Sequence, residues 1–414
     1  MNTYPFTCVE RFLKYVRFDT QSDPDSTTVP STEKQKLLAA ALVEELQQLG
    51  LSDAAMDNNG YVTATLPSNS EKSVPVIGLI AHMDTSPDVS GKDVKPMIHR
   101  NYQGGDIVLG QSGVIIRADE NPILRQLIGH DIITSDGTTL LGADDKAGIA
   151  EIFDALSYFI ANPHVKHGKI RVAITPDEEI GKGADHFDVQ AFGADAAYTV
   201  DGETPGEVED ETFCADSVTL TIKGVNVHPG YAKDKMVNSI KIAAEIIEHL
   251  PKHTLSPETT EKREGYVHPH SIGGNEEQTI IKFLIRDFAA EGLKEKENLL
   301  KEIVDNILAV HPKAAYDFQV TEFYRNMKYK LAEYPRVVEY AMEAVRRAGL
   351  MPVRHAIRGG TDGARLCYMG LLTPNLFAGG HNFHARTEYI SAQDMQKAVE
   401  VIVELVKLWE EKSS

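Results

Sequence analysis

The chain has 414 residues, of which 42% are hydrophobic and 25% charged, and its formal net charge is −19. Because this length exceeds what one hydrophobic core usually serves, we expect a globular protein of two domains. The negative charge argues against a nucleic-acid partner, which would need a clustered basic surface, and no apolar run is long enough to cross a bilayer.

Predicted helices and strands alternate in the first half of the chain. Apolar residues at helical spacing predict one helix that ends near Gly50 and another that begins at Gly148. The nearly continuous apolar run before His82 is typical of a strand buried on both faces. This alternation indicates an α/β fold, a mostly parallel sheet with helices on both faces. The predicted helices span 31–49 and 148–160, and the predicted strands span 61–66, 74–81, 170–175 and 196–200.

The pattern changes in the middle of the chain and then returns. Residues 213–323 are predicted to form a smaller α+β domain, inserted into a first domain that comprises 1–212 and 324–414. Within the insert, the polar and turn-rich stretch 251–275 indicates a long loop. The insert has predicted strands at 217–222, 279–287 and 315–323 and helices at 239–250 and 293–310; after it come helices at 336–348 and 392–409 and a strand at 373–377.

Histidine and carboxylate side chains follow several of these strands or precede a helix. In an open α/β sheet, ligands bind at the carboxyl ends of the strands, so five segments would deliver such groups to one edge. Taken singly, a histidine or an acidic pair in such a place is more often a surface or turn residue. Their joint occurrence favours a metal site. The residues are His82 and Asp84, Asp144 and Asp145, Glu178 and Glu179, Asp201, and His384.

Charge repulsion strengthens the case for a metal. Carboxylates about 5 Å apart would repel by roughly 3 kcal/mol per pair at an effective dielectric of about 20, which calls for protonation or a cation. Two zinc ions would be neutralised by Asp144, Glu179, Asp201 and one hydroxide. Imidazole with carboxylate suits zinc better than calcium, and cobalt or manganese could substitute.

Five short strings carry a resemblance to a known family. The chain resembles the peptidase T family, the tripeptide aminopeptidase branch of the co-catalytic zinc peptidases (family M20), from near Arg11 to the last helix. The strings occur in the family's order and spacing. They are AHMDTSPD (81–88), LGADDKAG (141–148), TPDEEIG (175–181), TVDG (199–202) and IRGGTDG (357–363).

The resemblance implies two Zn²⁺ per subunit. It assigns His82 and Asp201 to one ion and Glu179 and His384 to the other, with Asp144 as the bridge. Asp84 would fix the imidazole of His82, and Glu178 would be the general base for a water that the two zinc ions bridge. The implied reaction is removal of the N-terminal residue from tripeptides, and the implied peptide bond between Asp144 and Asp145 is cis.

One string departs from the family. Peptidase T enzymes usually have Tyr-Asn-Tyr-His-Gly where this chain has His381-Asn382-Phe383-His384-Ala385. His381 is therefore a rival ligand. We prefer His384, which matches the family's position and is followed four residues later by Glu388.

Substrate binding is inferred from the same resemblance. His228, in the insert, would stabilise the oxyanion, and Arg286 and Arg358 would grip the peptide's carboxylate and so measure its length. Without the family, the sequence favours His228 as a turn histidine before a proline, and Arg286 could equally pair with Asp287 or with a neighbour on a strand edge. The insert would act as a lid and as a possible homodimer interface.

Other functions remain open. A deacylase or dipeptidase of the same superfamily would keep the same zinc ligands. A non-enzymatic binding protein of the same fold would have lost Glu178 or a ligand, and a structural zinc protein would use a cysteine set. The three cysteines, Cys8, Cys214 and Cys367, are far apart and offer neither a zinc knuckle nor a disulfide framework. Because residues 1–20 have no signal-peptide core, we expect a cytoplasmic enzyme.

Overall fold

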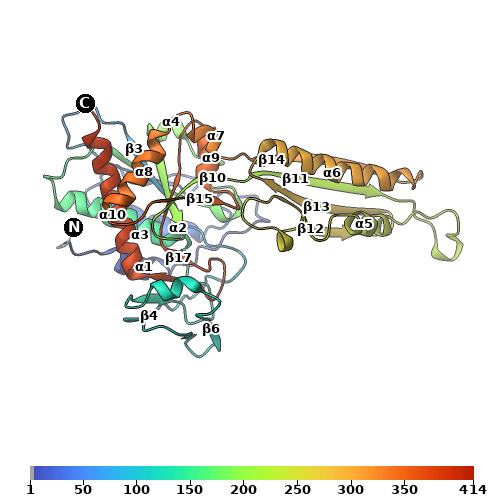
Figure 1. The fold of residues 1–414 in the computed structure, drawn as a ribbon, viewed down its shortest axis with the longest axis horizontal. Helices are drawn as coiled ribbons and strands as arrows, with labels where there is room; N and C mark the ends of the chain where they lie inside the picture. Colours follow the sequence, from blue (N-terminus) through green and yellow to red (C-terminus); the bar gives the residue numbers. More distant parts are fainter. Residues whose placement is uncertain (1–3) are drawn as a thin grey trace. The chain divides into compact units, whose positions relative to one another are not determined.

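The computed structural model describes residues 4–414, which form two compact units (Figure 1). The first unit comprises residues 4–210, 329–355 and 361–414, and the second comprises 211–328 and 356–360. The segment 213–323, which the sequence predicts as an insert, falls within the second unit.

An eight-stranded sheet forms the centre of the first unit. Its four middle strands are parallel to one another, and the pairs β1–β2, β2–β8 and β10–β16 are antiparallel. The prediction of a mostly parallel sheet is therefore confirmed for its buried centre. In spatial order the strands are β1 (Ala55–Met56), β2 (Val62–Leu66), β8 (Ile170–Thr175), β3 (Ile77–His82), β9 (Ala196–Gly202), β16 (Asn375–Phe377), β10 (Glu207–Thr212) and β15 (Val353–Ile357).

Helices cover both faces of this sheet, as two consecutive residues of β9 show, because successive side chains of a strand point to opposite faces. The Tyr198 hydroxyl donates to the carbonyl of Val337 in α8 (Arg336–Arg347) and accepts from Trp409 in α10 (Ala392–Glu411). Its neighbour Ala197 packs in a cluster with Phe192 of α4 (Val189–Phe192) and Leu366 of α9 (Asp362–Tyr368). Further helices of this unit are α1 (Cys8–Tyr15), α2 (Gln35–Gln48) and α3 (Ala143–Ala161), the last of which packs on β3, β9 and α10.

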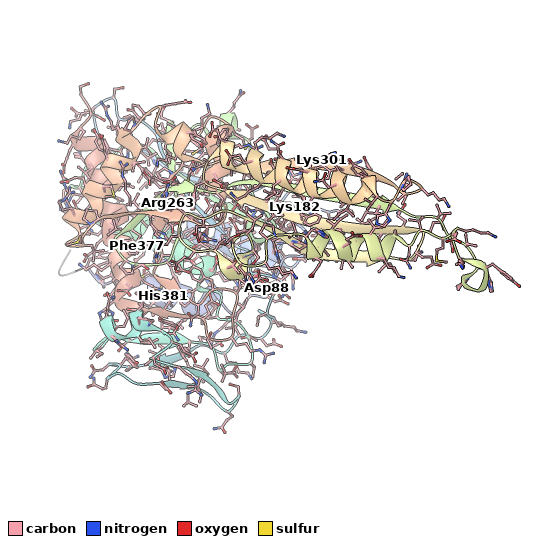
Figure 2. The ribbon with its side chains drawn as sticks, turned by 45° about the vertical axis from the view of Figure 1, so that its right-hand side comes forward. Asp88, Lys182, Arg263, Lys301, Phe377 and His381 are labelled. Carbon is pink, nitrogen blue, oxygen red and sulfur yellow. The ribbon has the colours of Figure 1, made fainter. Side chains whose placement is uncertain are left out.

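Two small antiparallel sheets complete the first unit. The sequence predicted no strands between 82 and 148, because each strand here has only three residues and shows no clear periodicity. The larger sheet runs β17 (Gly380–His381), β18 (Tyr389–Ser391), β7 (Ile132–Thr134) and β4 (Met97–His99), and the smaller one pairs β5 (Ile107–Leu109) with β6 (Val114–Ile116). Figure 2 draws the side chains and labels Phe377 at the end of β16 and His381 at the end of β17.

The second unit is an antiparallel sheet with two helices. α5 (Ser239–Glu248) and α6 (Ala290–Ala309) bury an apolar core with the sheet, as the sequence predicted. One prediction was wrong: the expected loop over 251–275 contains β12. This edge strand carries Pro269, two histidines and a bulge, which hide its alternation. The strand order is β12 (Tyr266–Gly274), β13 (Gln278–Asp287), β11 (Cys214–Lys223) and β14 (Ala315–Tyr324).

Candidate metal centre

Three parallel strands bring their ends to one edge of the main sheet. β3 ends at His82, and β9 carries Asp201 next to its last residue. β8 ends at Thr175 and is followed by the 3-10 turn Glu178–Ile180. Because these strands run parallel, their carboxyl ends place the three segments together.

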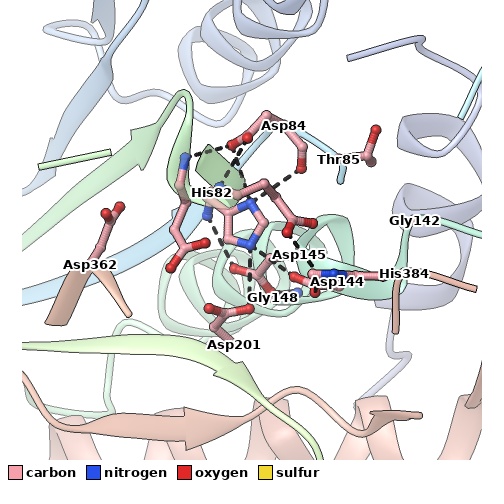
Figure 3. Close-up of polar contacts among 12 residues, drawn as sticks. His82, Asp84, Thr85, Gly142, Asp144, Asp145, Gly148, Asp201, Asp362 and His384 are labelled. Atoms are coloured by element: carbon pink, nitrogen blue, oxygen red, sulfur yellow. Dashed lines mark hydrogen bonds and ion pairs between the residues drawn. The ribbon is translucent and has the colours of Figure 1, made fainter. Parts of the chain in front are cut away.

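Two imidazoles lie on either side of Asp144, the second residue of α3. His82 Nε2 is 2.8 Å from Asp144 Oδ1 and 3.4 Å from Asp201 Oδ1. His384 Nε2 is 3.2 Å from Asp144 Oδ2 and 2.8 Å from Glu179 Oε2. Each imidazole thus has a carboxylate of its own and shares Asp144. Figure 3 labels His82, Asp144, Asp201 and His384. The five residues predicted as ligands form one cluster, all within the first unit.

The backbone around Asp144 is held by a carboxylate from the other end of the chain. Glu388 accepts the backbone N–H groups of Leu141, Gly142 and Asp144 at 2.7, 2.8 and 3.1 Å. The Asp144–Asp145 peptide is cis, and both residues depart from helical geometry inside α3. The three bonds to Glu388 therefore fix the start of α3, the segment that carries Asp144.

Asp145 faces the sheet and ties α3 to β3. Its carboxylate accepts the backbone N–H groups of His82 at 3.1 Å and Gly148 at 3.2 Å. A Cβ atom on Gly148 would lie 1.9 Å from the Val200 carbonyl oxygen, so only glycine allows this approach of helix and strand. One possible ligand atom from each of Asp145, His82 and Asp201 lies within 4.8 Å of the other two, although both Asp145 oxygens already accept N–H groups.

Asp84 is fully buried between His82 and the turn that follows β8. Its carboxylate accepts the backbone N–H groups of Glu178 at 3.0 Å and Glu179 at 3.2 Å. His82 Nδ1 donates to the backbone carbonyl of Asp84 at 3.2 Å and lies 3.4 Å from Asp84 Oδ1. Asp84 therefore acts on both the imidazole and the segment that carries the two glutamates.

The cluster carries more negative charge than its own histidines balance. Burial and the neighbouring Asp144 raise the pKa of Glu179 to about 8, and burial raises the pKa of Asp201 to about 7. Burial would lower the pKa of His82, but Asp201 and Asp144 hold it well above its usual value. Ring nitrogens and carboxylate oxygens in this crowded, buried setting fit divalent cations that accept both donors, zinc among them.

Glu178 stands beside this cluster. Burial and the nearby carboxylates of Asp201 and Asp362 raise its pKa well above the usual value for glutamate. Asp362 is itself buried and accepts the Thr175 hydroxyl at 2.8 Å. A carboxyl group that binds protons this readily is suited to general acid–base work.

His381, the rival ligand, has other contacts. Its ring is buried against Tyr389, with the ring centroids 5.1 Å apart. The ion pairs with Asp144 and Glu179 are made by His384 instead. The sequence singled out neither Asp362 nor the bonding role of Glu388. The position of Glu388 four residues after His384 was the available signal for the latter.

The three residues predicted to bind substrate all belong to the second unit. His228 is exposed, and its Nδ1 accepts the backbone N–H of Gly230 at 3.1 Å. Arg286 is 7% exposed, donates to the carbonyls of Asp216 and Ile285, and lies over the rings of Phe323 and Tyr324.

The guanidinium of Arg358 is held within its own unit. It donates to the carbonyls of Lys262 and Glu264 at 2.9 and 2.8 Å and to the Thr260 hydroxyl at 3.0 Å. It also lies over the rings of Phe213 and Tyr266. These bonds fix the loop 260–264, and the substrate role of Arg358 stays a prediction.

Comparison with known proteins gives consistent matches over nearly the full chain. The model of "Peptidase family M20/M25/M40" matches residues 137–408. Peptidase T of Geobacillus kaustophilus is 52% identical over 407 residues, 98% of this chain and 99% of its own. The crystal structure of aminopeptidase PepT from Bacillus cereus has a TM-score of 0.75 at 25% identity, covering 97% of this chain and 98% of that one.

A more distant structure shows the same fold. The Bacillus subtilis YXEP protein, described as a dinuclear metal-binding peptidase from the M20 family, has a TM-score of 0.64 at 14% identity over 97% of each chain.

Among the helices of residues 4–414, none has the length and apolar character needed to span a membrane.

Proposed function

The chain belongs to peptidase family M20/M25/M40, and from this membership we propose that it is a metal-dependent aminopeptidase that removes the N-terminal residue from tripeptides. The observation that carries the proposal is Asp144 lying between two imidazoles, each with a further carboxylate. Relatives that are about half identical over the whole chain are peptidase T enzymes, which supports the choice of tripeptides.

We assign two zinc ions to the cluster, with cobalt or manganese as substitutes. His82 and Asp201 would hold one ion, Glu179 and His384 the other, and Asp144 both. Bound there, the ions would polarise the scissile carbonyl and lower the pKa of the attacking water.

Glu178 performs the proton transfers. It takes a proton from the water as the water attacks the peptide carbonyl, and it gives that proton to the nitrogen of the leaving dipeptide. Its raised pKa, caused by burial and nearby carboxylates, makes the protonated form accessible for the second transfer. Asp84 keeps this base in place through the backbone N–H groups of Glu178 and Glu179.

The second unit supplies the substrate-length filter in this proposal. Arg286 and Arg358 bind the peptide's free carboxylate, and His228 donates to the oxyanion of the tetrahedral intermediate. The unit closes over the substrate as a lid, and it is also the surface through which a homodimer would form. The enzyme acts on short peptides in the cytoplasm, with neither nucleic acid nor membrane as a partner.

A peptide-length assay tests the proposal. The zinc-loaded enzyme is incubated with Ala-Ala, Ala-Ala-Ala, Ala-Ala-Ala-Ala and N-acetyl-alanine, and released alanine is measured together with bound metal. We expect the highest kcat/KM for Ala-Ala-Ala and two metal ions per chain. Preferential cleavage of the dipeptide or of the N-acyl amino acid would assign the chain to another activity of the superfamily.

A further inference from the structure

A second group of metal-type side chains lies in the first unit, on the neighbouring strands β10 and β15 (Figure 1). Glu207 and Glu209 are two positions apart on β10, so their side chains point to the same face of the sheet. His355 is on β15, the strand at the edge of the sheet. Two side chains from one strand and one from the next therefore converge, and none of the three belongs to the candidate metal centre.

The distances within this group fit the coordination of one divalent cation. His355 Nδ1 lies 3.4 Å from Glu209 Oε1 and 3.7 Å from Glu207 Oε2. One ligand atom from each of the three residues lies within 4.8 Å of the other two. In a tetrahedral site with bonds of about 2.0–2.1 Å, two ligand atoms are roughly 3.3 Å apart. Rotation of these side chains would therefore bring all three atoms onto one ion.

The two carboxylates carry more negative charge than one imidazole can balance. The side chains of Glu207 and Glu209 are 18% and 7% exposed, so both have lost most of their contact with water. Both form an ion pair with His355, and within residues 4–414 neither pairs with a lysine or arginine. Because a buried carboxylate without a counter-charge is costly, this arrangement favours the entry of a doubly charged ion.

Glu209 is oriented by a buried hydrogen bond, as metal ligands usually are. Asn375 Nδ2 donates to Glu209 Oε2, which leaves Oε1 to face His355. Asn375 is fully buried on β16, and its Oδ1 accepts the backbone N–H of Asp201 at 3.1 Å. An outer bond of this kind fixes the direction of a ligand and strengthens its binding to metal. The Glu209 carboxylate is therefore held in place before any ion arrives.

We propose that Glu207, Glu209 and His355 form a third divalent-cation site, which binds zinc through His355 Nδ1, Glu209 Oε1 and Glu207 Oε2. Imidazole with carboxylate suits zinc, cobalt or nickel, whereas magnesium and calcium prefer oxygen ligands. The His355 side chain is 48% exposed, so water can complete the coordination. Because more carboxylates gather at the metal centre, that centre fills first and the third site fills at higher zinc concentration.

A zinc titration of enzyme that already holds two zinc ions tests the site. Isothermal titration calorimetry at pH 7 should detect one further ion per chain in the wild-type protein. His355→Lys keeps a positive charge opposite the two carboxylates, but the ammonium group has no lone pair for a metal. We expect this variant to weaken binding of the third ion by more than about 100-fold, because even loss of a ligand's outer partner costs about 10- to 100-fold.

His311→Lys is the matched control, because His311 forms an ion pair with one carboxylate, that of Glu245, in the second unit. It should bind the third ion as the wild type does, and both variants should hold two ions before titration. The proposal is overturned if the wild type takes up no further ion, if His355→Lys binds it with unchanged affinity, or if His311→Lys loses it as well. Cleavage of Ala-Ala-Ala does not require the third ion, so failure of this proposal and failure of the proposed function are distinguishable.

Discussion

Asp84 lies between the imidazole of His82 and the backbone of two glutamates. These are Glu178, the proposed base, and Glu179, a candidate metal ligand. Two N–H groups, from Glu178 and Glu179, point at its carboxylate. We predict that Asp84→Asn lowers kcat by about 10- to 100-fold, because an amide has one acceptor oxygen and its NH₂ group would face an N–H donor. Steady-state kinetics on Ala-Ala-Ala measure the effect. Asp93→Asn, at an exposed position nearby, is the control, and an equal loss in both variants would contradict the assignment.

Glu178 is predicted to act on protons and not to hold a metal ion. Glu178→Ala should retain two metal ions and lose nearly all turnover, at least about 100-fold, as expected when a general base is removed. Metal analysis and single-turnover kinetics on the same sample separate the two properties. Normal turnover, or loss of an ion, would show that Glu178 has another role.

Sequence reasoning locates the ligands better than the groups that orient them. His82, Glu179 and Asp201 could be found because each stands at or just beyond the end of a buried strand in a parallel set. Glu388 could not be assigned its bonds to Leu141 and Gly142, because the partners are about 250 positions apart and the donors are backbone N–H groups. The spacing of four residues from His384 marks Glu388 as a candidate but does not identify the backbone groups that it binds.

At the scale of elements, α3 and α10 bury carboxyl groups that are not among the candidate metal ligands. Glu151 in α3 is fully buried, and neither of its carboxyl oxygens has a hydrogen-bond partner among the described residues. Burial, together with Asp394 of α10, raises its pKa well above the usual value. The group is therefore neutral in the folded protein at pH values where it ionises in the unfolded chain.

This difference predicts a pH-dependent stability. As pH rises from the unfolded pKa of about 4.5 toward the higher folded pKa, ionisation of Glu151 favours the unfolded chain by about 1.4 kcal/mol per pH unit. Glu151→Met removes this cost, so the variant should gain stability over wild type between pH 5 and pH 8, by about 1.4 kcal/mol per pH unit until the folded pKa is reached, and should differ little at pH 4. Urea unfolding at several pH values measures it.

Asp154, three residues later in the same helix, is the control for Glu151, because its buried carboxyl group has hydrogen-bond donors. Its buried carboxylate accepts bonds from Tyr4 at 2.9 Å, from the Thr7 N–H at 2.8 Å and hydroxyl at 2.7 Å, and from the Cys8 N–H at 2.9 Å. Asp154→Asn should therefore destabilise the protein by about 1–3 kcal/mol at pH 7. Destabilisation by both variants would contradict the account of Glu151.

Helices and strands were predicted correctly where a periodic apolar pattern extends over many residues, and they were missed where a strand is short or its pattern is masked. The long amphipathic helices α5, α6, α8 and α10 were all predicted from apolar spacing. β12 was missed because Pro269 and exposed histidines mask its pattern at a sheet edge. The three-residue strands β4 and β7 form only through pairing with each other and with β18, which local sequence does not show.

At the scale of the whole molecule, all five candidate ligands come from one of the two units. A metal that binds only the folded state stabilises the part that binds it, so chelation should lower the unfolding temperature of the first unit and leave that of the second unchanged. Differential scanning calorimetry with and without zinc measures both transitions. Val304→Ala, in the buried core of the second unit, identifies that unit's transition. Equal shifts of both transitions on chelation would contradict a centre confined to the first unit.

Substrate length is the property that the proposal assigns to the second unit. Arg286 is nearly buried, with its guanidinium over two aromatic rings and bonded to two backbone carbonyls, so its charge is held in a fixed position. We predict that Arg286→Ala lowers kcat/KM for Ala-Ala-Ala by about 100-fold and for Ala-Ala-Ala amide by less than about 5-fold, because only the first substrate has a carboxylate for the arginine to bind. Arg263→Ala, which removes an exposed arginine of the same unit, should affect the two substrates alike. If Arg286→Ala also lowers both to the same degree, Arg286 supports the sheet around it and does not read the end of the peptide.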